Sequence, residues 1–173
     1  MTGTTGTGTT GIGTTGTGTT GTGMGGAVRR VLVVCLGNIC RSPMGEAALR
    51  RAAGEAGLAL EVDSAGTGAW HEGEPPHPTA LSVAAGRGYD NAALRARKVT
   101  AEDFDRFDLI LGMDASNLAN LERVRPEGSH ARLAAFDAGA DVPDPYGRPV
   151  AAYEAVLDQI EAAARAWATR LAG

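Results

Sequence analysis

The stretch VLVVCLGNICRSP, residues 31–43, decides the fold of this chain. Its first four residues are apolar and predict a buried strand that ends at Cys35. Ser42 and Pro43 then open a segment in which apolar residues recur at helical spacing, so a short loop must join a strand to a helix. Backbone N–H groups in such a loop, and at the start of the helix, point at one spot and form a cradle for an anion.

The side chains of this loop predict nucleophilic chemistry. Cys35 lies at the mouth of the cradle, where N–H dipoles and the cation of Arg41 favour a reactive thiolate. The planar fork of Arg41 can hold two oxygens of a phosphate group. Ser42 can donate its hydroxyl to the thiolate, and Asn38 tolerates the left-handed backbone that a tight loop needs. The remaining expected phosphate-binding or supporting residues are Leu36, Gly37, Ile39 and Cys40.

Composition divides the chain of 173 residues into two parts. Residues 1–26 are almost only Gly and Thr and cannot bury enough apolar surface to order themselves, so we predict a disordered tail. Residues 27–173 suffice for one compact domain. The tail lacks the basic start and apolar core of a signal peptide. Met24, just before the domain, leaves a second translation start open.

Charge and cysteine content exclude several classes of function. A net charge of −4 argues against nucleic acid as the main partner. No apolar run approaches the roughly 20 residues that span a membrane. The two cysteines lie in one loop and do not form the disulfide framework of a secreted fold, so we expect a cytoplasmic protein. Two thiolates alone do not fill a tetrahedral metal site, and we expect no metal.

Strand-like and helix-like segments alternate along the domain. Strands are predicted at 28–35, 58–62, 107–111 and 131–136, and the main helices at 43–57, 79–87, 115–124 and 150–171. This alternation predicts an α/β fold of three layers, a four-stranded parallel sheet with helices on both faces. Ligands of such folds bind beyond the carboxyl ends of the strands. The Cys35 loop, the turn expected at 64–68 and the loop at 141–149 should therefore meet at one edge.

Thiolate attack on phosphorus would give a phosphocysteine, and the departing oxygen would then need a proton. Asp144 is the best source, because Pro143 and Pro145 stiffen its loop. A solvated turn aspartate is the alternative interpretation of an Asp-Pro pair. Asp141 is the rival acid and lacks the same support.

With Asp-Pro-Tyr-Gly at 144–147, the cysteine loop resembles the low-molecular-weight protein tyrosine phosphatase family from about Val31 to the end of the chain. Segments 63–67, 96–97 and 107–114 also match. The resemblance implies Cys35 as nucleophile, Arg41 as phosphate ligand and Asp144 as general acid and base, without a metal or organic cofactor. It implies that Trp70 and Tyr146 wall a cleft for an aryl phosphate, although a Trp in such a loop is otherwise more often a packing anchor.

The same resemblance implies a phosphotyrosine-containing protein as partner, with an autophosphorylating tyrosine kinase as one example. It also implies that Cys40 could form a disulfide with an oxidised Cys35; a small packed residue is the alternative. One position departs from the family, because Leu94 stands where a histidine usually supports the loop asparagine. What holds Asn38 is therefore open, and none of His71, His77 and His130 matches a catalytic role.

Three other functions compete with a tyrosine phosphatase. Thioredoxin-coupled arsenate reductases share this loop but need further cysteines, and none follows Cys40. Protein arginine phosphatases have threonine where this chain has Ile39, and an apolar Ile fits an aromatic ring better than a guanidinium. A non-catalytic phosphate-binding or interaction module is opposed by the joint presence of Cys35, Arg41 and Asp144. Hydrolysis of phosphotyrosine is the favoured function.

Overall fold

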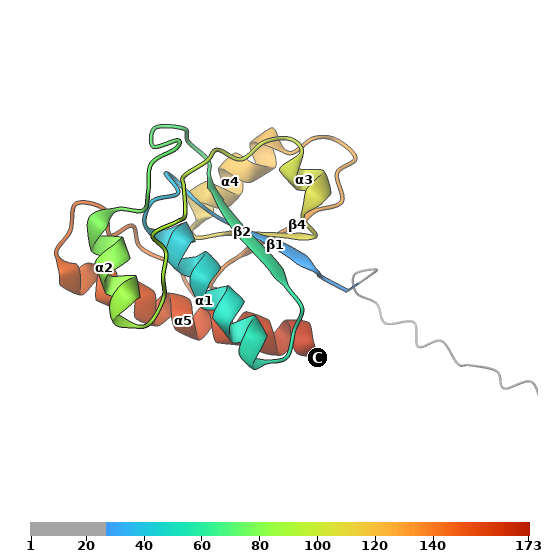
Figure 1. Ribbon diagram of the computed structural model, residues 1–173. Helices are drawn as coiled ribbons and strands as arrows, with labels where there is room; N and C mark the ends of the chain where they lie inside the picture. The colour runs from blue at the N-terminus through green and yellow to red at the C-terminus, as the bar shows by residue number, and fades with distance from the viewer. Residues whose placement is uncertain (1–26) are drawn as a thin grey trace, which may run out of the picture.

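The computed structural model describes residues 27–173, and the tail predicted at 1–26 lies outside the described residues. Four strands form one parallel sheet in the order β2-β1-β3-β4, as Figure 1 shows. The strands are β1 (Arg30–Cys35), β2 (Glu61–Gly66), β3 (Leu109–Gly112) and β4 (Arg132–Ala135). The predicted α/β fold with a four-stranded parallel sheet is confirmed.

Helices cover both faces of this sheet. The helices are α1 (Arg41–Glu55), α2 (Pro78–Gly86), α3 (Asp103–Arg106), α4 (Ala115–Val124) and α5 (Val150–Ala172). Helices α1, α2 and α5 lie together on one face, and α3 and α4 lie on the other (Figure 1). Among residues 27–173, no helix combines the length and apolar character needed to cross a membrane.

Strand β1 separates two hydrophobic cores because successive side chains point to opposite faces. Val31 and Val33 enter the larger core with α1 and α5, and Leu32 and Val34 enter the smaller core with α3 and α4. All four side chains are fully buried. The continuous apolar run before Cys35 is therefore that of a central parallel strand, covered on both faces.

Strand β2 differs from its prediction. The sequence placed a strand at 58–62 and a turn at 64–68, but β2 starts at Glu61 and ends at Gly66. Its backbone pairs with β1 along its whole length, up to Cys35 opposite Gly66. Ser64 is buried as well, and its hydroxyl oxygen accepts a hydrogen bond from the Asn38 side chain. The small and polar residues at 64–66 therefore form the end of a strand that contacts the cysteine loop, and they do not form a turn.

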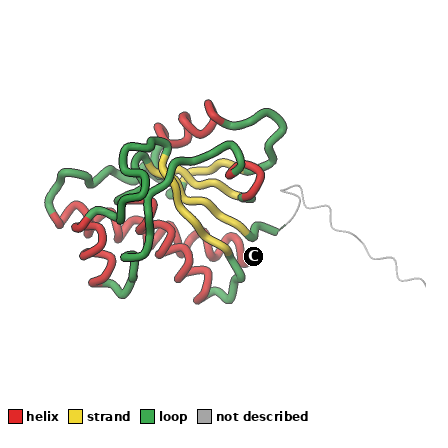
Figure 2. The backbone as a smooth tube through the Cα atoms, turned by 45° about the horizontal axis from the view of Figure 1, so that its top comes forward, coloured by secondary structure: helices red, strands yellow, loops and turns green. Residues whose placement is uncertain are grey.

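The loops that follow the strands gather at the carboxyl edge of the sheet (Figure 2). The cysteine loop follows β1, residues 67–77 follow β2, and residues 136–149 lead from β4 to α5. Arg87, just after α2, contacts three carboxylates of α5, those of Glu154, Asp158 and Glu161. These contacts fix α2 on α5 and so hold the 67–77 loop in place.

Candidate active site

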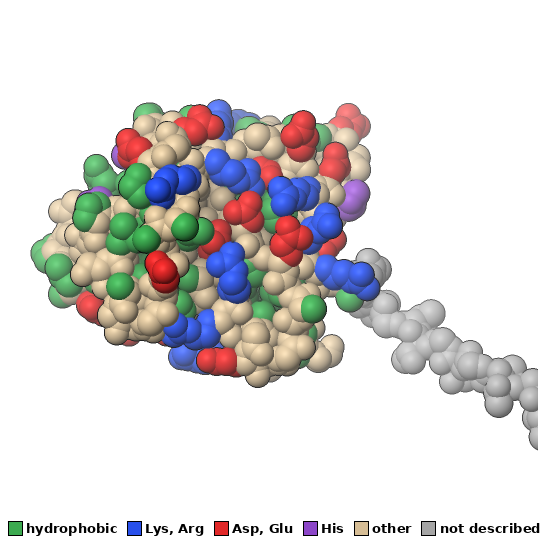
Figure 3. Space-filling view, viewed as in Figure 1, with side chains coloured by type: hydrophobic (Ala, Val, Ile, Leu, Met, Phe, Trp, Pro, Cys, Tyr) green, Lys and Arg blue, Asp and Glu red, His purple; other side chains and the backbone are tan. Residues whose placement is uncertain are grey.

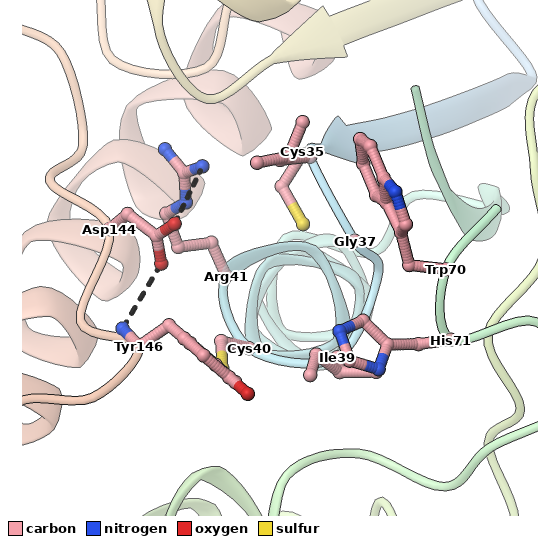
Figure 4. A pocket seen from close by; sticks show the side chains of 10 residues that line it. Cys35, Gly37, Ile39, Cys40, Arg41, Trp70, His71, Asp144 and Tyr146 are labelled. Atoms are coloured by element: carbon pink, nitrogen blue, oxygen red, sulfur yellow. Dashed lines mark hydrogen bonds and ion pairs between the residues drawn. The ribbon is translucent and has the colours of Figure 1, made fainter. Parts of the chain in front are cut away.

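A cavity of about 160 Å³ opens at the carboxyl edge of the sheet. It is lined by Cys35, Leu36, Gly37, Ile39, Cys40, Arg41, Trp70, His71, Asp144 and Tyr146. In Figure 4 the Cys35 sulfur points into the space between two walls, one with Trp70 and His71 and one with Asp144 and Tyr146. An enclosed apolar cavity of about 150 Å³ accepts a benzene ring, so this cavity has room for one aromatic ring.

The Cys35 sulfur lies among hydrogen-bond donors. Its Sγ accepts the Asn38 N–H at 3.3 Å and lies 3.1 Å from the Ser42 Oγ. Asn38 has a φ of 58°, which is the left-handed backbone expected for it. This turn brings the Asn38 N–H back onto the sulfur. Helix α1 begins immediately behind the loop, and its N-terminal dipole also favours a negative charge there.

Asn38 is held by two serines and a backbone N–H. Its Nδ2 donates to the Ser42 Oγ at 2.7 Å and to the Ser64 Oγ at 3.0 Å. Its Oδ1 accepts the backbone N–H of Arg97 at 3.0 Å. These contacts answer the question that Leu94 left open. Since Asn38 donates to Ser42, the Ser42 hydroxyl proton has two acceptors within reach, the Cys35 sulfur at 3.1 Å and the Ala65 carbonyl at 3.4 Å, of which the sulfur is the nearer. Sequence reasoning assigned Ser64 and Arg97 no role, because both act from segments distant from the loop.

The backbone at the end of β2 packs directly against the backbone of the cysteine loop, with no side chain between them. A Cβ atom at Gly66 would lie 2.8 Å from the Leu36 carbonyl oxygen and 3.1 Å from the Asn38 backbone nitrogen. Only glycine fits this approach of two backbones. The segment next to Cys35 is therefore packed against β2 as closely as main chains allow.

Arg41 is almost completely buried, with 3% of its surface exposed. Its Nη1 donates to the Asp114 Oδ2 at 2.6 Å and to the Val142 carbonyl at 2.9 Å. These contacts orient the guanidinium so that Nη2 lies 3.9 Å from the Asp144 Oδ2. The sequence predicted the helix at 115–124 but assigned Asp114, the residue before it, no part in the site. Asp114 does cap α4, by accepting the Asn117 N–H at 2.8 Å, but its second oxygen holds Arg41.

Asp144 and Asp141 are placed differently. The Asp144 side chain is 45% exposed at the mouth of the cavity, and its Oδ1 accepts the Tyr146 N–H at 3.1 Å (Figure 4). Asp141 instead accepts the Ala115 N–H at 3.1 Å and does not line the cavity. The geometry therefore favours Asp144 over its rival as a proton donor.

Cys40 lines the cavity but is almost completely buried, with its sulfur 3.7 Å from the Tyr153 hydroxyl. Burial raises the pKa of the Cys40 thiol to about 12. Cys40 therefore stays a thiol near neutral pH and does not compete with Cys35 as a nucleophile. Both cysteines are free.

Two exposed aromatic residues stand at the cavity mouth. Trp70 is 71% exposed and Tyr146 is 56% exposed. Such exposure does not fit the interpretation of Trp70 as a packing anchor. Two histidines that sequence reasoning left without a role flank Tyr146: His71, whose ring centre is 6.2 Å away, and His77, at 5.6 Å. Neither lies in a recognisable motif, and only the loop after β2 brings them there.

Comparison with known proteins agrees with this geometry. The family model for low molecular weight phosphotyrosine protein phosphatase matches residues 30–173. The chain is 48% identical over 126 residues to the low molecular weight phosphotyrosine protein phosphatase of Schizosaccharomyces pombe, covering 68% of this chain and 80% of that protein.

Solved structures share the fold. A protein tyrosine phosphatase from Entamoeba histolytica superposes with a TM-score of 0.78 at 32% identity, over 83% of this chain and 96% of that one. Wzb of Vibrio vulnificus, solved in complex with benzylphosphonate, gives 0.76 at 31% identity, over 83% and 99%. The chain therefore belongs to the low molecular weight protein tyrosine phosphatase family, and its activity is the hydrolysis of phosphotyrosine.

Proposed function

We propose that Cys35, Arg41 and Asp144 hydrolyse phosphotyrosine in two steps through a phosphocysteine intermediate. One observation carries this assignment: the sulfur, the guanidinium and the carboxyl group line one cavity that has room for an aromatic ring. The loop backbone and Ser42 support the nucleophile from behind.

In the first step the Cys35 thiolate attacks phosphorus. An S–P bond forms while the bond from phosphorus to the phenolic oxygen breaks, and the Asp144 carboxyl group gives its proton to that oxygen. The three remaining phosphate oxygens receive N–H groups of residues 36–41 and the Arg41 guanidinium. Tyrosine leaves as a neutral phenol.

In the second step water replaces the sulfur. The Asp144 carboxylate takes a proton from the water, whose oxygen attacks phosphorus as the S–P bond breaks. The leaving group is the Cys35 thiolate, and the Ser42 hydroxyl 3.1 Å away stabilises it with a hydrogen bond. Inorganic phosphate and the free enzyme are the products.

An aryl phosphate suits the walls of the cavity. Trp70 and Tyr146 face each other across it and Ile39 adds an apolar contact, whereas a phosphoarginine side chain would leave its guanidinium beside these apolar groups. The relative from Vibrio vulnificus was solved with benzylphosphonate, which carries an aromatic ring on its phosphonate. Tyrosine phosphate is therefore favoured over arginine phosphate.

The partner in the cell would be a phosphotyrosine-containing protein, and an autophosphorylating tyrosine kinase fits this description. We place the reaction in the cytoplasm, because both cysteines are free and the reaction needs Cys35 reduced.

The decisive experiment compares variants of the two reacting side chains. Cys35→Ser should abolish turnover of p-nitrophenyl phosphate while inorganic phosphate still binds. Asp144→Asn should slow phosphotyrosine by about 10²- to 10⁴-fold, and p-nitrophenyl phosphate less, because p-nitrophenolate leaves without a proton. Asp141→Asn is the matched control and should change neither rate. Full activity of Cys35→Ser, or equal losses on both substrates for Asp144→Asn, would contradict the assignment.

The competing functions are tested with the same protein. Phosphotyrosine, phosphoarginine and arsenate are offered side by side to the purified wild type. Release of phosphate from phosphotyrosine alone supports the proposal. Faster release from phosphoarginine, or reduction of arsenate, would replace it.

A further inference from the structure

A second cavity, of about 320 Å³, adjoins the active-site cavity. The two share Ile39, His71 and Tyr146, which form a common wall. The other lining residues are Glu74, Pro75, Pro76, His77, Pro78 and Leu81. We call this cavity the proline groove. None of the chemical steps proposed above uses it.

The segment that forms the proline groove has restricted backbone freedom and is tied to the rest of the domain. Three of its residues are prolines, whose fixed φ angles limit the motion of the segment. His77 connects the segment to the cysteine loop, because its N–H donates to the Ile39 carbonyl at 2.8 Å. The His77 ring stacks on Tyr153 at 5.6 Å, and its Nδ1 accepts the Thr79 N–H at 3.1 Å. A ligand would therefore meet a surface that needs little ordering on binding.

The chemistry of the proline groove selects apolar groups. Its walls are proline, isoleucine, leucine, tyrosine and two histidine side chains, and Glu74 is the one acidic residue among those that line it. Glu74 already pairs with the His71 Nδ1 at 2.8 Å. An acidic ligand group would lose its water and face Glu74, with no lysine or arginine among the residues that line the groove, whereas an apolar group would gain burial. In Figure 3, hydrophobic side chains also gather on the side where α2 lies in Figure 1.

We propose that the proline groove binds an apolar side chain of the substrate protein, two residues from the phosphotyrosine. This rests on the proposed function, because the phosphotyrosine must occupy the adjoining cavity. In an extended segment, side chains two residues apart point to the same side and are separated by about 6.6 Å. Because the two cavities share one wall of side chains, two neighbouring side chains on the same side of one extended segment are the groups suited to enter them. The enzyme would therefore select phosphotyrosine by its surroundings as well as by its phosphate.

The test uses phosphotyrosine peptides that differ at one position. In each peptide, Leu, Ala or Glu stands either two residues before or two residues after the phosphotyrosine. The other positions that flank the phosphotyrosine are Ala. We expect Leu at one of the two positions to raise kcat/KM by about five- to tenfold over Ala, mainly through KM, as partial burial of a leucine side chain predicts. Glu should be poorer than Ala. Equal kcat/KM for Leu, Ala and Glu at both positions would overturn the proposal.

Variants of α2 locate the effect. Leu81→Glu puts a charge into the proline groove and should bring the Leu-to-Ala ratio of kcat/KM to about one. Ser82→Glu adds the same charge at the neighbouring exposed position and should leave that ratio, and turnover of p-nitrophenyl phosphate, unchanged. If Leu81→Glu does not fold, Leu81→Ala should still lower the ratio at least twofold. A ratio that survives the folded Leu81 variant would overturn the groove assignment.

The experiments distinguish failure of the proposed function from failure of the proline-groove proposal. Wild type that turns over neither p-nitrophenyl phosphate nor any phosphotyrosine peptide contradicts the proposed function. Wild type that hydrolyses all peptides at the same rate leaves the proposed function standing and refutes only the role of the proline groove.

Discussion

Substitution of Asp114 should have a specific effect, because its two carboxylate oxygens bind different partners. Oδ1 accepts the Asn117 N–H and caps α4, while Oδ2 holds the buried Arg41 at 2.6 Å. Asp114→Asn keeps an oxygen for the cap, and asparagine caps helices about as well as aspartate. It presents an NH₂ group to the Arg41 Nη1, so that two donors face each other. The substitution therefore removes the Arg41 contact and spares the helix.

The magnitude follows from the kind of bond that is lost. A hydrogen bond to a charged group contributes about 1.5–3 kcal/mol. If that free energy is lost from the transition state, in which Arg41 must hold the phosphate oxygens, kcat/KM falls by about 10- to 150-fold, at 1.36 kcal/mol per factor of ten. The Val142 carbonyl still holds the same nitrogen at 2.9 Å, which argues for the lower half of this range.

The assay is steady-state hydrolysis of p-nitrophenyl phosphate, with far-ultraviolet circular dichroism to show that α4 is intact. Asp141→Asn is the matched control: it also contacts the start of α4, through the Ala115 N–H, but it does not touch Arg41. Its kcat/KM should stay within twofold of wild type. A folded Asp114→Asn protein with wild-type kcat/KM would refute the view that Asp114 orients Arg41.

Three further predictions test the surroundings of the nucleophile. Gly66→Ala should lower kcat/KM by about 100-fold, because the added Cβ displaces the backbone at Leu36. Gly54→Ala is the control, since its Cβ meets no atom within 4 Å and should leave kcat/KM unchanged. Equal activities of the two variants would contradict the close packing of β2 on the cysteine loop. Iodoacetate at pH 8 should modify Cys35 but not Cys40, whose pKa burial raises to about 12, and mass spectrometry showing label on Cys40 in the folded protein would oppose this. Burial also raises the pKa of Glu46 above its ordinary 4.5, so the folded state binds its proton more tightly than the unfolded state. This contribution to the free energy of unfolding is lost as the pH rises from about 4.5 through the raised pKa. In urea titrations over that pH range, the free energy of unfolding of Glu46→Gln should therefore rise relative to that of wild type. A difference between the two proteins that does not change with pH would contradict this prediction.

The sequence was sufficient for the four-stranded parallel sheet and for every residue that lines the cavity except His71. The apolar run before Cys35 could only be a strand covered on both faces, and parallel strands place their following loops at one edge. Trp70 and Asp144 therefore meet Cys35 in the structure, although about 35 and 110 positions separate them from it along the chain.

The supporting contacts could not be predicted in the same way. Ser64 and Arg97 contact Asn38 only because β2 extends to Gly66 and pairs beside the loop, and small polar residues at a strand end look like a turn. Asp114 showed the pattern of a helix cap, which concealed its second partner, Arg41. In each case the decisive contact joins segments whose register is set by tertiary packing, which local sequence patterns do not report.

The contacts of Asn38 have a consequence for folding. They join α1, β2 and the segment at Arg97, three parts of the chain that come together only when the domain is assembled. Arg41 of the same loop is held in turn by Asp114 and Val142, so an intermediate in which any of these segments is unassembled has no competent nucleophile loop. Catalytic turnover is therefore a probe of global cooperativity: during refolding it should appear with the last tertiary signal, and in a denaturant titration its midpoint should coincide with that of the whole domain.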